Sequence, residues 1–209
     1  MKFIETEFAD VKLIESKIFS DPRGSFFGVF EQEAFENQGI TEVFLQDSIS
    51  YSKTNVIRGL HYQEPNAQGK LVCPLRGSIF DVVVDIRLGS PNFKKWMGVE
   101  LNSKQGNMLW IPPGFAHGFA ALTKEVSLLY KLTHRYDPEN QYVINWRDPD
   151  LNIEWPISNP ILSDRDTNAP LLSEISISSR HFDNNFFQYR YCSLKKSNNI
   201  SKGLFNITI

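Results

Sequence analysis

The segment RGLHYQEPNAQGK, residues 58–70, holds the side chains with the clearest chemical potential. It gathers Arg58, His61 and Lys70 in a stretch that is predicted to be rich in turns, between two apolar runs. A histidine with a pKa near neutrality can act as a general base, and two neighbouring cations suit a substrate that carries phosphate or develops an oxyanion. The segment is equally compatible with a half-buried His61 that only completes a hydrogen-bond network.

A second segment, WIPPGFAHGFAAL at residues 110–122, places His117 among small and apolar residues. Proline before glycine predicts a type II turn ahead of this histidine. Such a turn between two apolar strands would hold His117 in a fixed position, facing into a barrel. The alternative is a core histidine that is bonded to a backbone carbonyl.

The elements that must position these side chains are short. Apolar or alternating runs recur between turn signals, which is typical of strands. They lie at residues 26–30, 39–45, 71–75, 78–86, 96–101, 108–111 and 126–132. Glycine and proline pairs separate them, and one short helix is predicted at residues 31–38. Many short strands at such intervals indicate an all-β sandwich or barrel.

Composition limits the classes of protein to which the chain can belong. With 209 residues and 41% hydrophobic content, it can bury one substantial core. The net charge of −2 is spread over both signs without runs, which argues against nucleic acid as a partner. No apolar run approaches the roughly 20 residues of a membrane span. The first residues are too acidic for a signal peptide, so a cytoplasmic protein with no membrane contact is expected.

The C-terminal part differs in composition. Residues 148–169 are rich in Pro, Asp and Asn, and we predict an ordered loop that packs on the barrel, with Trp146 and Trp155 as anchors. The sequence therefore predicts one domain over residues 1–175 and a tail of unassigned structure over residues 176–209. Cys73 and Cys192 show neither metal-ligand spacing nor a disulfide framework, so free thiols are expected.

Several motifs follow one another in nearly uninterrupted order. They are DPRGSFF (21–27), FLQD (44–47), RGLHYQ (58–63), AQGKLV (67–72), FDVVVDIR (80–87), WIPPGFAHGF (110–119), LYKLTHRYDPE (129–139), NWRDPDLNIEWP (145–156) and LSDRD (162–166). Together they resemble the dTDP-4-dehydrorhamnose 3,5-epimerase family of the cupin superfamily. The resemblance covers residues 2–172, and the last residues fall outside it.

The resemblance implies a jelly-roll, cupin-like barrel with short helices and a C-terminal loop region. It also implies homodimers that exchange N-terminal strands, and residues 3–8 would supply a strand edge for this. The family uses neither a metal nor another cofactor. The residue two after His61 is Gln63, where a metal-binding cupin needs a second histidine, and His61 with His117 is a thin ligand set. A metal-dependent cupin oxygenase stays open as an alternative.

The activity that the resemblance implies is inversion of C3 and C5 in a nucleotide-linked 4-keto-6-deoxy sugar. The reaction type is dTDP-4-dehydro-6-deoxyglucose to dTDP-4-dehydrorhamnose, in a pathway that makes deoxysugars for surface polysaccharide. By motif position, His61 paired with Asp166 removes a proton, and Tyr130 supplies a new one from the opposite face. Lys70 would stabilise the enolate as charge builds on its oxygen.

Further residues are assigned to substrate binding by the same resemblance. Guanidinium groups suit a diphosphate, which gives Arg58 and Arg23 that role. Phe26 and Gln46 occupy positions that contact the nucleotide. The remaining candidates for contact with the substrate are Ser48, His117 and Gln141.

Three departures from the family pattern leave the identity of the sugar and of the nucleotide undetermined. Gly28 and Gln141 stand where the family commonly has glutamate, and Ser48 stands where it commonly has asparagine. The enzyme could therefore invert only C3, or act on a sugar linked to GDP or CDP. An alternative of another class is a cupin module that binds a nucleotide sugar without catalysis.

Overall fold

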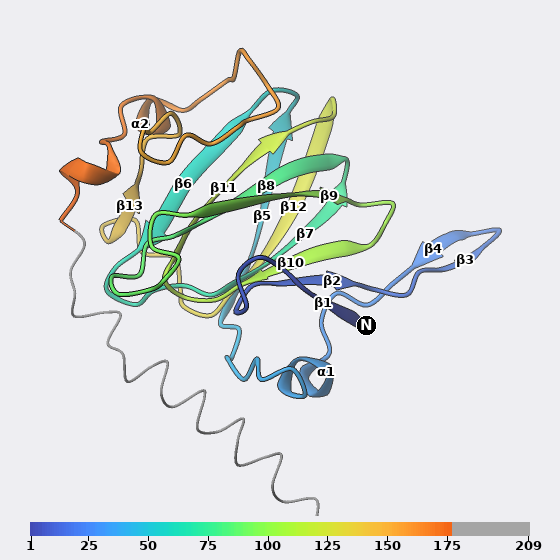
Figure 1. The fold of residues 1–209 in the computed structure, drawn as a ribbon. Coiled ribbons are helices and arrows are strands. Elements are labelled where there is room, and N and C mark those ends of the chain that lie inside the picture. The colour runs from blue at the N-terminus through green and yellow to red at the C-terminus, as the bar shows by residue number, and fades with distance from the viewer. Residues whose placement is uncertain (177–209) are drawn as a thin grey trace, which may run out of the picture.

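The computed structural model describes residues 1–176, which form two packed β-sheets with a C-terminal segment laid against one of them (Figure 1). The predicted tail, apart from Ser176, and Cys192 lie outside the described residues. Cys73 is a buried free thiol, as predicted. Within residues 1–176, no helix has the length and apolar character needed to cross a membrane.

The first sheet has six strands in the order β1-β2-β10-β7-β12-β5. Their bounds are Lys2–Glu5, Lys12–Glu15, Asn107–Ile111, Lys70–Arg76, Glu125–Leu132 and Gln46–Lys53. The second sheet has five strands in the order β13-β6-β11-β8-β9. Their bounds are Gln141–Val143, Ile57–Gln63, Phe115–Ala121, Ser78–Asp85 and Trp96–Asn102. Neighbouring strands pair antiparallel throughout both sheets, and the predicted all-β jelly roll is confirmed.

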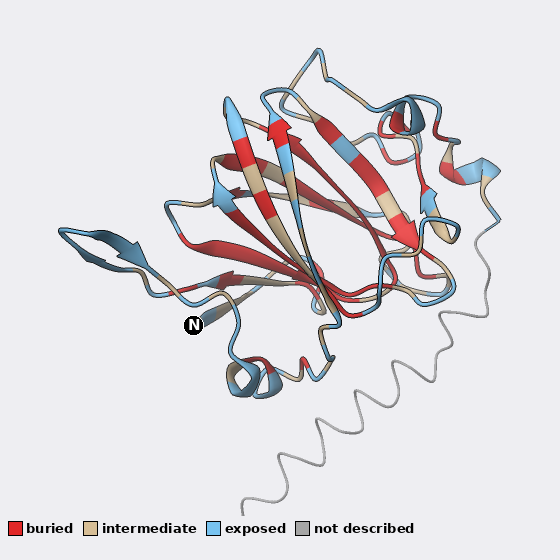
Figure 2. Cartoon of the chain, turned by 180° about the vertical axis from the view of Figure 1, so that it is seen from behind, coloured by how far each residue is buried: buried red, intermediate tan, exposed pale blue. Residues whose placement is uncertain are grey.

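Three helices and one hairpin complete the described chain. The helices are α1 at Gln32–Glu36, α2 at Asp164–Thr167 and a 3₁₀ turn at Leu172–Glu174. The hairpin pairs β3, Phe19–Asp21, with β4, Gly24–Phe26, and it projects away from the sheets (Figure 1). All six strand residues of this hairpin are exposed (Figure 2).

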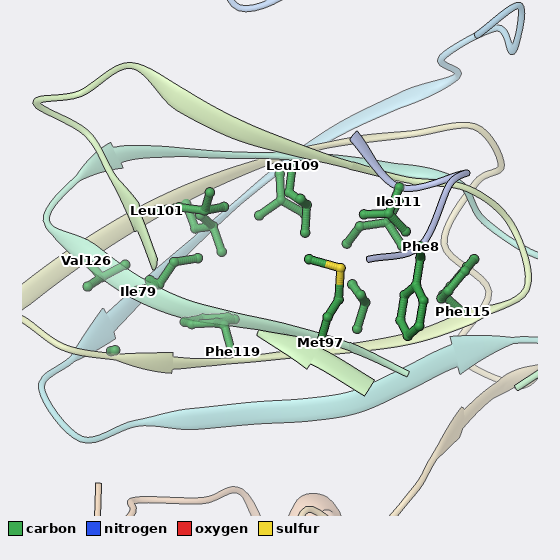
Figure 3. Packing of buried hydrophobic residues seen from close by; sticks show 14 residues of the cluster. Phe8, Ile79, Met97, Leu101, Leu109, Ile111, Phe115, Phe119 and Val126 are labelled. Carbon is green, nitrogen blue, oxygen red and sulfur yellow. The ribbon is translucent and has the colours of Figure 1, made fainter. Parts of the chain in front are cut away.

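The main core fills the space between the two sheets. Side chains alternate between the two faces of a strand, so every second residue points to the opposite sheet. Val83 and Phe119 from the five-stranded sheet belong to one apolar cluster with Val72 and Leu128 from the six-stranded sheet, and Figure 3 shows the packing around them. Burying each such side chain contributes about 1.5–3 kcal/mol to folding. This core holds the inward faces of the two sheets at a fixed separation.

A second apolar layer covers the outer face of the five-stranded sheet. Leu60 and Tyr62 pack there against Ile144, Leu151 and other residues of the C-terminal segment. Trp155 donates from its indole nitrogen to the carbonyl oxygen of the buried Trp146, at 2.9 Å. The predicted ordered loop with these two tryptophans as anchors is confirmed.

The strand predictions succeeded where apolar residues dominate the sequence. The runs at 71–75, 78–86, 96–101, 108–111 and 126–132 correspond to β7, β8, β9, β10 and β12, and the helix predicted at 31–38 is present as the shorter α1. The strand predicted at 39–45 is wrong, because Ile40 and Phe44 pack with Phe35 of α1 instead of pairing in a sheet. The strand predicted at 26–30 is also wrong beyond its first residue, since β4 ends at Phe26.

Six strands, β2, β3, β5, β6, β11 and β13, lie outside the predicted runs. The segment predicted to be rich in turns begins with β6, and the stretch around His117 is β11. Both contain glycine and histidine in place of the β-branched residues that usually mark strands. The turn before β11 lies where proline and glycine predicted it. Gly114 there has φ +95°, the left-handed backbone that a type II turn requires.

Candidate active site

An irregularity in β6 brings Arg58 and His61 to the same face of the sheet. His61 pairs with His117 of β11, whereas Arg58 pairs with Phe119, so three steps along β6 match two along β11. This register shift is a β-bulge, and without it residues an odd number apart would face opposite sides. The shift depends on Gly59, which has φ +121° and whose added Cβ would lie 2.5 Å from a backbone carbon of β11.

The imidazole of His61 is bonded to the carboxylate of Asp166, with 2.6 Å between Nε2 and Oδ1. Asp166 lies in α2, and its side chain is 4% exposed. Ser163 caps the start of this helix: its Oγ accepts from the backbone N–H of Asp166 at 3.1 Å and donates to Oδ2 at 2.9 Å. The C-terminal segment therefore folds back over β6 and fixes both oxygens of this carboxylate.

The charges of this pair follow from its surroundings. Burial raises the pKa of Asp166, but the hydrogen bonds from His61, Ser163 and the Gly59 N–H outweigh it, and the pKa lies below its usual value. Burial lowers the pKa of His61, and the positive charges of Lys70 and Arg165 lower it further. Together these effects outweigh Asp166, which raises it, and the pKa lies below its usual value. At neutral pH a neutral imidazole faces a carboxylate. Its Nε2 then carries the hydrogen, and Nδ1 is the acceptor for a new proton.

Lys70 joins the two sheets beside this pair. It begins β7 in the six-stranded sheet, and its Nζ donates to the carbonyl oxygen of His61 at 3.2 Å. The residue is 7% exposed. Burial lowers the pKa of Lys70 to about 8, although the nearby negative charge of Asp81 acts in the opposite direction. The ammonium is charged at neutral pH and can stabilise an oxyanion in a poorly solvated place.

A second histidine–carboxylate pair lies on the same inward face. The Nε2 atom of His117 is 2.7 Å from Oδ1 of Asp81, and both side chains are buried. The partner of this histidine is thus a carboxylate and not a backbone carbonyl. Sequence reasoning missed Asp81, although a carboxylate at an inward position of the apolar run FDVVVDIR was a signal that could have found it. Within residues 1–176, its Oδ2 atom has no hydrogen-bond partner.

Tyr130 faces these groups from the six-stranded sheet. It lies on β12, and its ring centroid is 6.3 Å from that of His117 in an edge-to-face arrangement. Its phenol oxygen is 3.1 Å from the Oγ of Ser50, a residue that sequence reasoning also missed. Burial raises the pKa of Tyr130, so the phenol is protonated at neutral pH. His61 and Tyr130 therefore belong to opposite walls of one polar region inside the barrel.

Arg58 and Gln46 lie at the edge of this region. The Nε of Arg58 donates to the Oγ of Ser52 at 3.1 Å, and its Nη2 donates to the carbonyl oxygen of Tyr51 at 3.0 Å. Gln46 donates from Nε2 to Ser48 at 2.9 Å. Its Oε1 also accepts from the backbone N–H of Tyr136 at 2.8 Å. These contacts hold the guanidinium of Arg58 and the amide of Gln46 on or beside β5.

Gln141 on β13 is bonded to the C-terminal segment. Its Oε1 accepts from Nη1 of Arg165 at 2.9 Å, and its carbonyl oxygen accepts from Nη2 of the same guanidinium. Arg165 is the neighbour of Asp166, and β13 pairs with β6 so that Val143 lies opposite His61. The bonds between Gln141 and Arg165 thus tie together the two elements that carry His61 and Asp166.

Two predicted binding residues are not brought to this cluster. Arg23 and Phe26 lie on the projecting hairpin (Figure 1), where the Arg23 side chain is 89% exposed and bonded to Asp21. Phe26 is 72% exposed. No group of three or more His, Cys, Asp or Glu side chains placed to hold a metal ion occurs within residues 1–176.

Comparison with known proteins identifies the family. The sequence model described as dTDP-4-dehydrorhamnose 3,5-epimerase matches residues 5–174. The chain belongs to this family. It is 49% identical over 171 residues to a dTDP-4-dehydrorhamnose 3,5-epimerase of Shigella flexneri, and the match covers 81% of this chain and 94% of the relative. The expected nucleotide-sugar epimerase is thereby confirmed as the class of enzyme.

The family resemblance extends to solved structures. The fold superposes with a TM-score of 0.82 on a dTDP-6-deoxy-D-glucose-3,5-epimerase of Legionella pneumophila Philadelphia 1 in complex with dTDP-4-keto-L-rhamnose. The two sequences are 46% identical, and the match covers 84% of this chain and 94% of the other. A dTDP-4-dehydrorhamnose 3-epimerase of Streptomyces niveus is 38% identical over 74% of this chain and 76% of its own length.

Proposed function

We propose that this enzyme inverts C3 and C5 of a dTDP-linked 4-keto-6-deoxy sugar by taking a proton on one face of the ring and returning another on the opposite face. The single observation that carries the proposal is the arrangement of His61 with Asp166 on one wall and Tyr130 on the other. Inversion needs a base and an acid on opposite sides of the same carbon. Each positioned group contributes roughly 10²–10⁴-fold to such a reaction.

In the first step, the keto group at C4 makes the hydrogens on C3 and C5 acidic. The Nδ1 atom of His61 takes one of these protons, and the electrons of the broken C–H bond form an enolate. Asp166 stabilises the imidazolium that results, because its carboxylate is already bonded to Nε2. The ammonium of Lys70 stabilises the negative charge on the enolate oxygen.

In the second step, the phenol of Tyr130 gives its proton to the same carbon from the other face. The enolate electrons form the new C–H bond, and the phenol becomes a phenolate. Exchange with solvent then returns a proton to Tyr130 and removes one from His61. The same sequence of steps at the second carbon completes the conversion. His117, held by Asp81, lies close enough to Tyr130 to contact the sugar from the side.

The diphosphate and nucleotide need groups outside this interior. Arg58 lies at the edge of the site, and its guanidinium suits a diphosphate. Arg23 and the exposed Phe26 and Phe19 extend from the body of the protein. We propose a homodimer with exchanged N-terminal strands, in which the projecting hairpin enters the pocket of the other copy and supplies Arg23 and Phe26 to its substrate. Sedimentation at micromolar concentration tests this, because a monomer would leave each pocket without these two residues.

The second candidate function is inversion at C3 alone, or action on a GDP- or CDP-linked sugar. It is favoured by Gln141 and Ser48, which replace a carboxylate and an amide of the family pattern, and by the similarity to the Streptomyces niveus 3-epimerase. Gln141 is bonded to Arg165 in place of offering a charge to the ligand. Action in the cytoplasm, in a pathway for surface polysaccharide, stays a prediction.

One experiment separates these functions. The enzyme is incubated in heavy water with the 4-keto-6-deoxyglucose derivative of dTDP, GDP or CDP, and the sugar is followed by NMR. Inversion with deuterium at both C3 and C5 of the dTDP sugar supports the proposal, and deuterium at C3 alone supports the narrower activity. Deuterium at neither carbon with any of the three sugars, together with binding that survives His61→Ala, would establish the non-catalytic module. Stoichiometric iron or manganese in the purified protein would favour the oxygenase.

A further inference from the structure

The inward face of β5 is a row of polar side chains. Buried or half-buried residues alternate with exposed ones along this strand, and the inward set is Gln46, Ser48, Ser50 and Ser52. The outward set includes Ile49 and Tyr51, so the usual order of apolar inside and polar outside is reversed. A reversed edge strand of this kind offers hydroxyl groups to the interior of the barrel.

Three residues of this row form hydrogen bonds with groups other than the proposed catalytic residues. Gln46 is bonded to Ser48 and to the backbone of Tyr136, and Ser52 accepts from Arg58. Ser50 differs because its hydroxyl lies 3.1 Å from the phenol oxygen of Tyr130. In the register between the two strands, Tyr130 stands opposite Ser48, so its ring extends diagonally along β5 to reach Ser50. Diagonal neighbours on one face are within reach of an aromatic side chain.

We propose that Ser50 is a positioning residue for Tyr130, whose hydroxyl donates to the phenol oxygen and so directs the phenol hydrogen toward the substrate. The inference rests on the proposed function, since it assigns a role in the return of the proton. If the phenol instead donated to Ser50, its hydrogen would point at β5 and away from the sugar. Both groups are hydroxyls that can rotate, so the 3.1 Å contact allows Ser50 to be the donor, and return of the proton by Tyr130 requires that direction.

The same bond acts again after the proton has moved. Transfer breaks the phenol O–H bond, forms a C–H bond on the sugar with the enolate electrons, and leaves a negative charge on the oxygen of Tyr130. That charge forms in a buried place, where burial raises the pKa of the phenol and the bond from Ser50 lowers it. A hydrogen bond to a charged group is stronger than one between neutral groups. Ser50 therefore stabilises the form of Tyr130 that exists just after the transfer.

Removal of this hydroxyl has a particular signature. Abstraction by His61 does not involve Ser50, so the enolate still forms in Ser50→Ala. Return of the proton by Tyr130 is slower, and the imidazolium of His61 has time to exchange with heavy water. It then gives back deuterium to the face from which it took the proton. We expect substrate that is deuterated without inversion to accumulate, while inverted product falls roughly 10- to 100-fold.

The test measures the ratio of deuterated, uninverted substrate to inverted product by NMR for the full chain. Ser50→Thr keeps the hydroxyl and should restore the wild-type ratio, whereas Ser50→Cys keeps the size but has a weak donor and should resemble Ser50→Ala. Ser127→Ala is the matched control, because Ser127 is on the same strand as Tyr130 but an odd number of residues away, on the other face. Thermal unfolding midpoints show whether each variant is folded.

The outcomes separate the inference from the function on which it rests. A wild-type ratio in Ser50→Ala or, where that variant does not fold, in Ser50→Cys would overturn the role of Ser50 and leave the epimerase intact. A parallel fall of exchange and inversion would overturn it as well, because it would indicate a general loss of the site. Absence of both exchange and inversion in the wild-type enzyme would overturn the proposed function itself.

Discussion

The carboxylate of Asp166 lies 2.6 Å from the imidazole of His61, although 105 positions separate the two residues in the chain. A carboxylate so placed holds the hydrogen of the neutral imidazole on Nε2 and leaves Nδ1 free to accept a proton. It also raises the pKa of His61, in opposition to burial. The pair therefore sets both the orientation and the basicity of the proposed base.

Replacement of this carboxylate should affect turnover more than stability. In Asp166→Asn, kcat should fall roughly 10²–10⁴-fold, because the amide can donate to Nε2 and favour the wrong tautomer. Loss of the negative charge lowers the pKa of His61 further, so the acidic limb of the kcat/KM profile should move to lower pH. The exposed Asp164 of the same helix provides the control variant Asp164→Asn. Unchanged kcat in Asp166→Asn would exclude His61 with Asp166 as the base.

The pH dependence of the wild-type enzyme follows from two groups with lowered pKa. Activity needs neutral His61, so kcat/KM should rise as pH passes upward through a pKa below the ordinary value of 6.5. It also needs charged Lys70, whose pKa is about 8, so kcat/KM should fall as pH rises beyond about 8.

Lys70→Arg tests the assignment of the alkaline limb. Arginine stays charged throughout the accessible range, so this limb should disappear even if the maximum rate is lower. The variant Lys104→Arg, at an exposed turn, should keep the wild-type profile. An alkaline limb near pH 8 that persists in Lys70→Arg would assign it to another group.

The bonds between Arg165 and Gln141 lead to a further prediction. The positive charge of Arg165 lowers the pKa of His61. In Arg165→Gln the pKa of His61 should therefore rise, and the acidic limb of the profile should move to higher pH, opposite to the shift in Asp166→Asn. Loss of its hydrogen bonds to Gln141 should loosen Asp166 and reduce kcat/KM roughly 2- to 10-fold. Lys124→Gln removes an exposed charge elsewhere and serves as the control.

The opposite shifts expected for Arg165→Gln and Asp166→Asn test the electrostatic account of His61. If Arg165→Gln and Asp166→Asn shift the acidic limb in the same direction, the electrostatic account of His61 is wrong. If Arg165→Gln changes the rate but leaves the limb in place, Arg165 acts only through its bonds to Gln141. Profiles of kcat/KM measured between pH 5 and 9 for the three enzymes, wild type included, distinguish these cases.

The sequence predicted the strands well where both faces of the strand are buried. The run FDVVVDIR predicted β8 because β-branched residues mark buried strands. The same rule missed β5, whose inward residues are polar and whose apolar Ile49 and Tyr51 face outward. Asp166 and Tyr130 were reached through the family resemblance, because no local spacing connects them to His61. Asp81 was not predicted, although its inward position in FDVVVDIR was a usable signal. Ser50 was not predicted because only its contact with Tyr130 on the neighbouring strand distinguishes it from the other serines of β5.

The geometry of the site depends on the absence of a side chain at Gly59. A Cβ there would lie 2.5 Å from the Cα of Gly118 and 2.7 Å from the carbonyl oxygen of His117, on a backbone with φ +121°. Backbone atoms cannot give way as a flexible side chain can, so Gly59→Ala should lower the free energy of unfolding by roughly 3 kcal/mol or more.

The matched control for Gly59→Ala is Gly28→Ala. An added Cβ at Gly28 would meet Met1 at 3.7 Å, an ordinary contact, so its stability should stay within about 0.5 kcal/mol of the wild type. The bulge at Gly59 places Arg58 and His61 on one face. The activity of Gly59→Ala should therefore fall by more than the fraction of molecules that are unfolded. Chemical denaturation, with kcat measured well below the unfolding midpoint, checks both effects. A stable and fully active Gly59→Ala would show that the bulge is not needed to assemble the site.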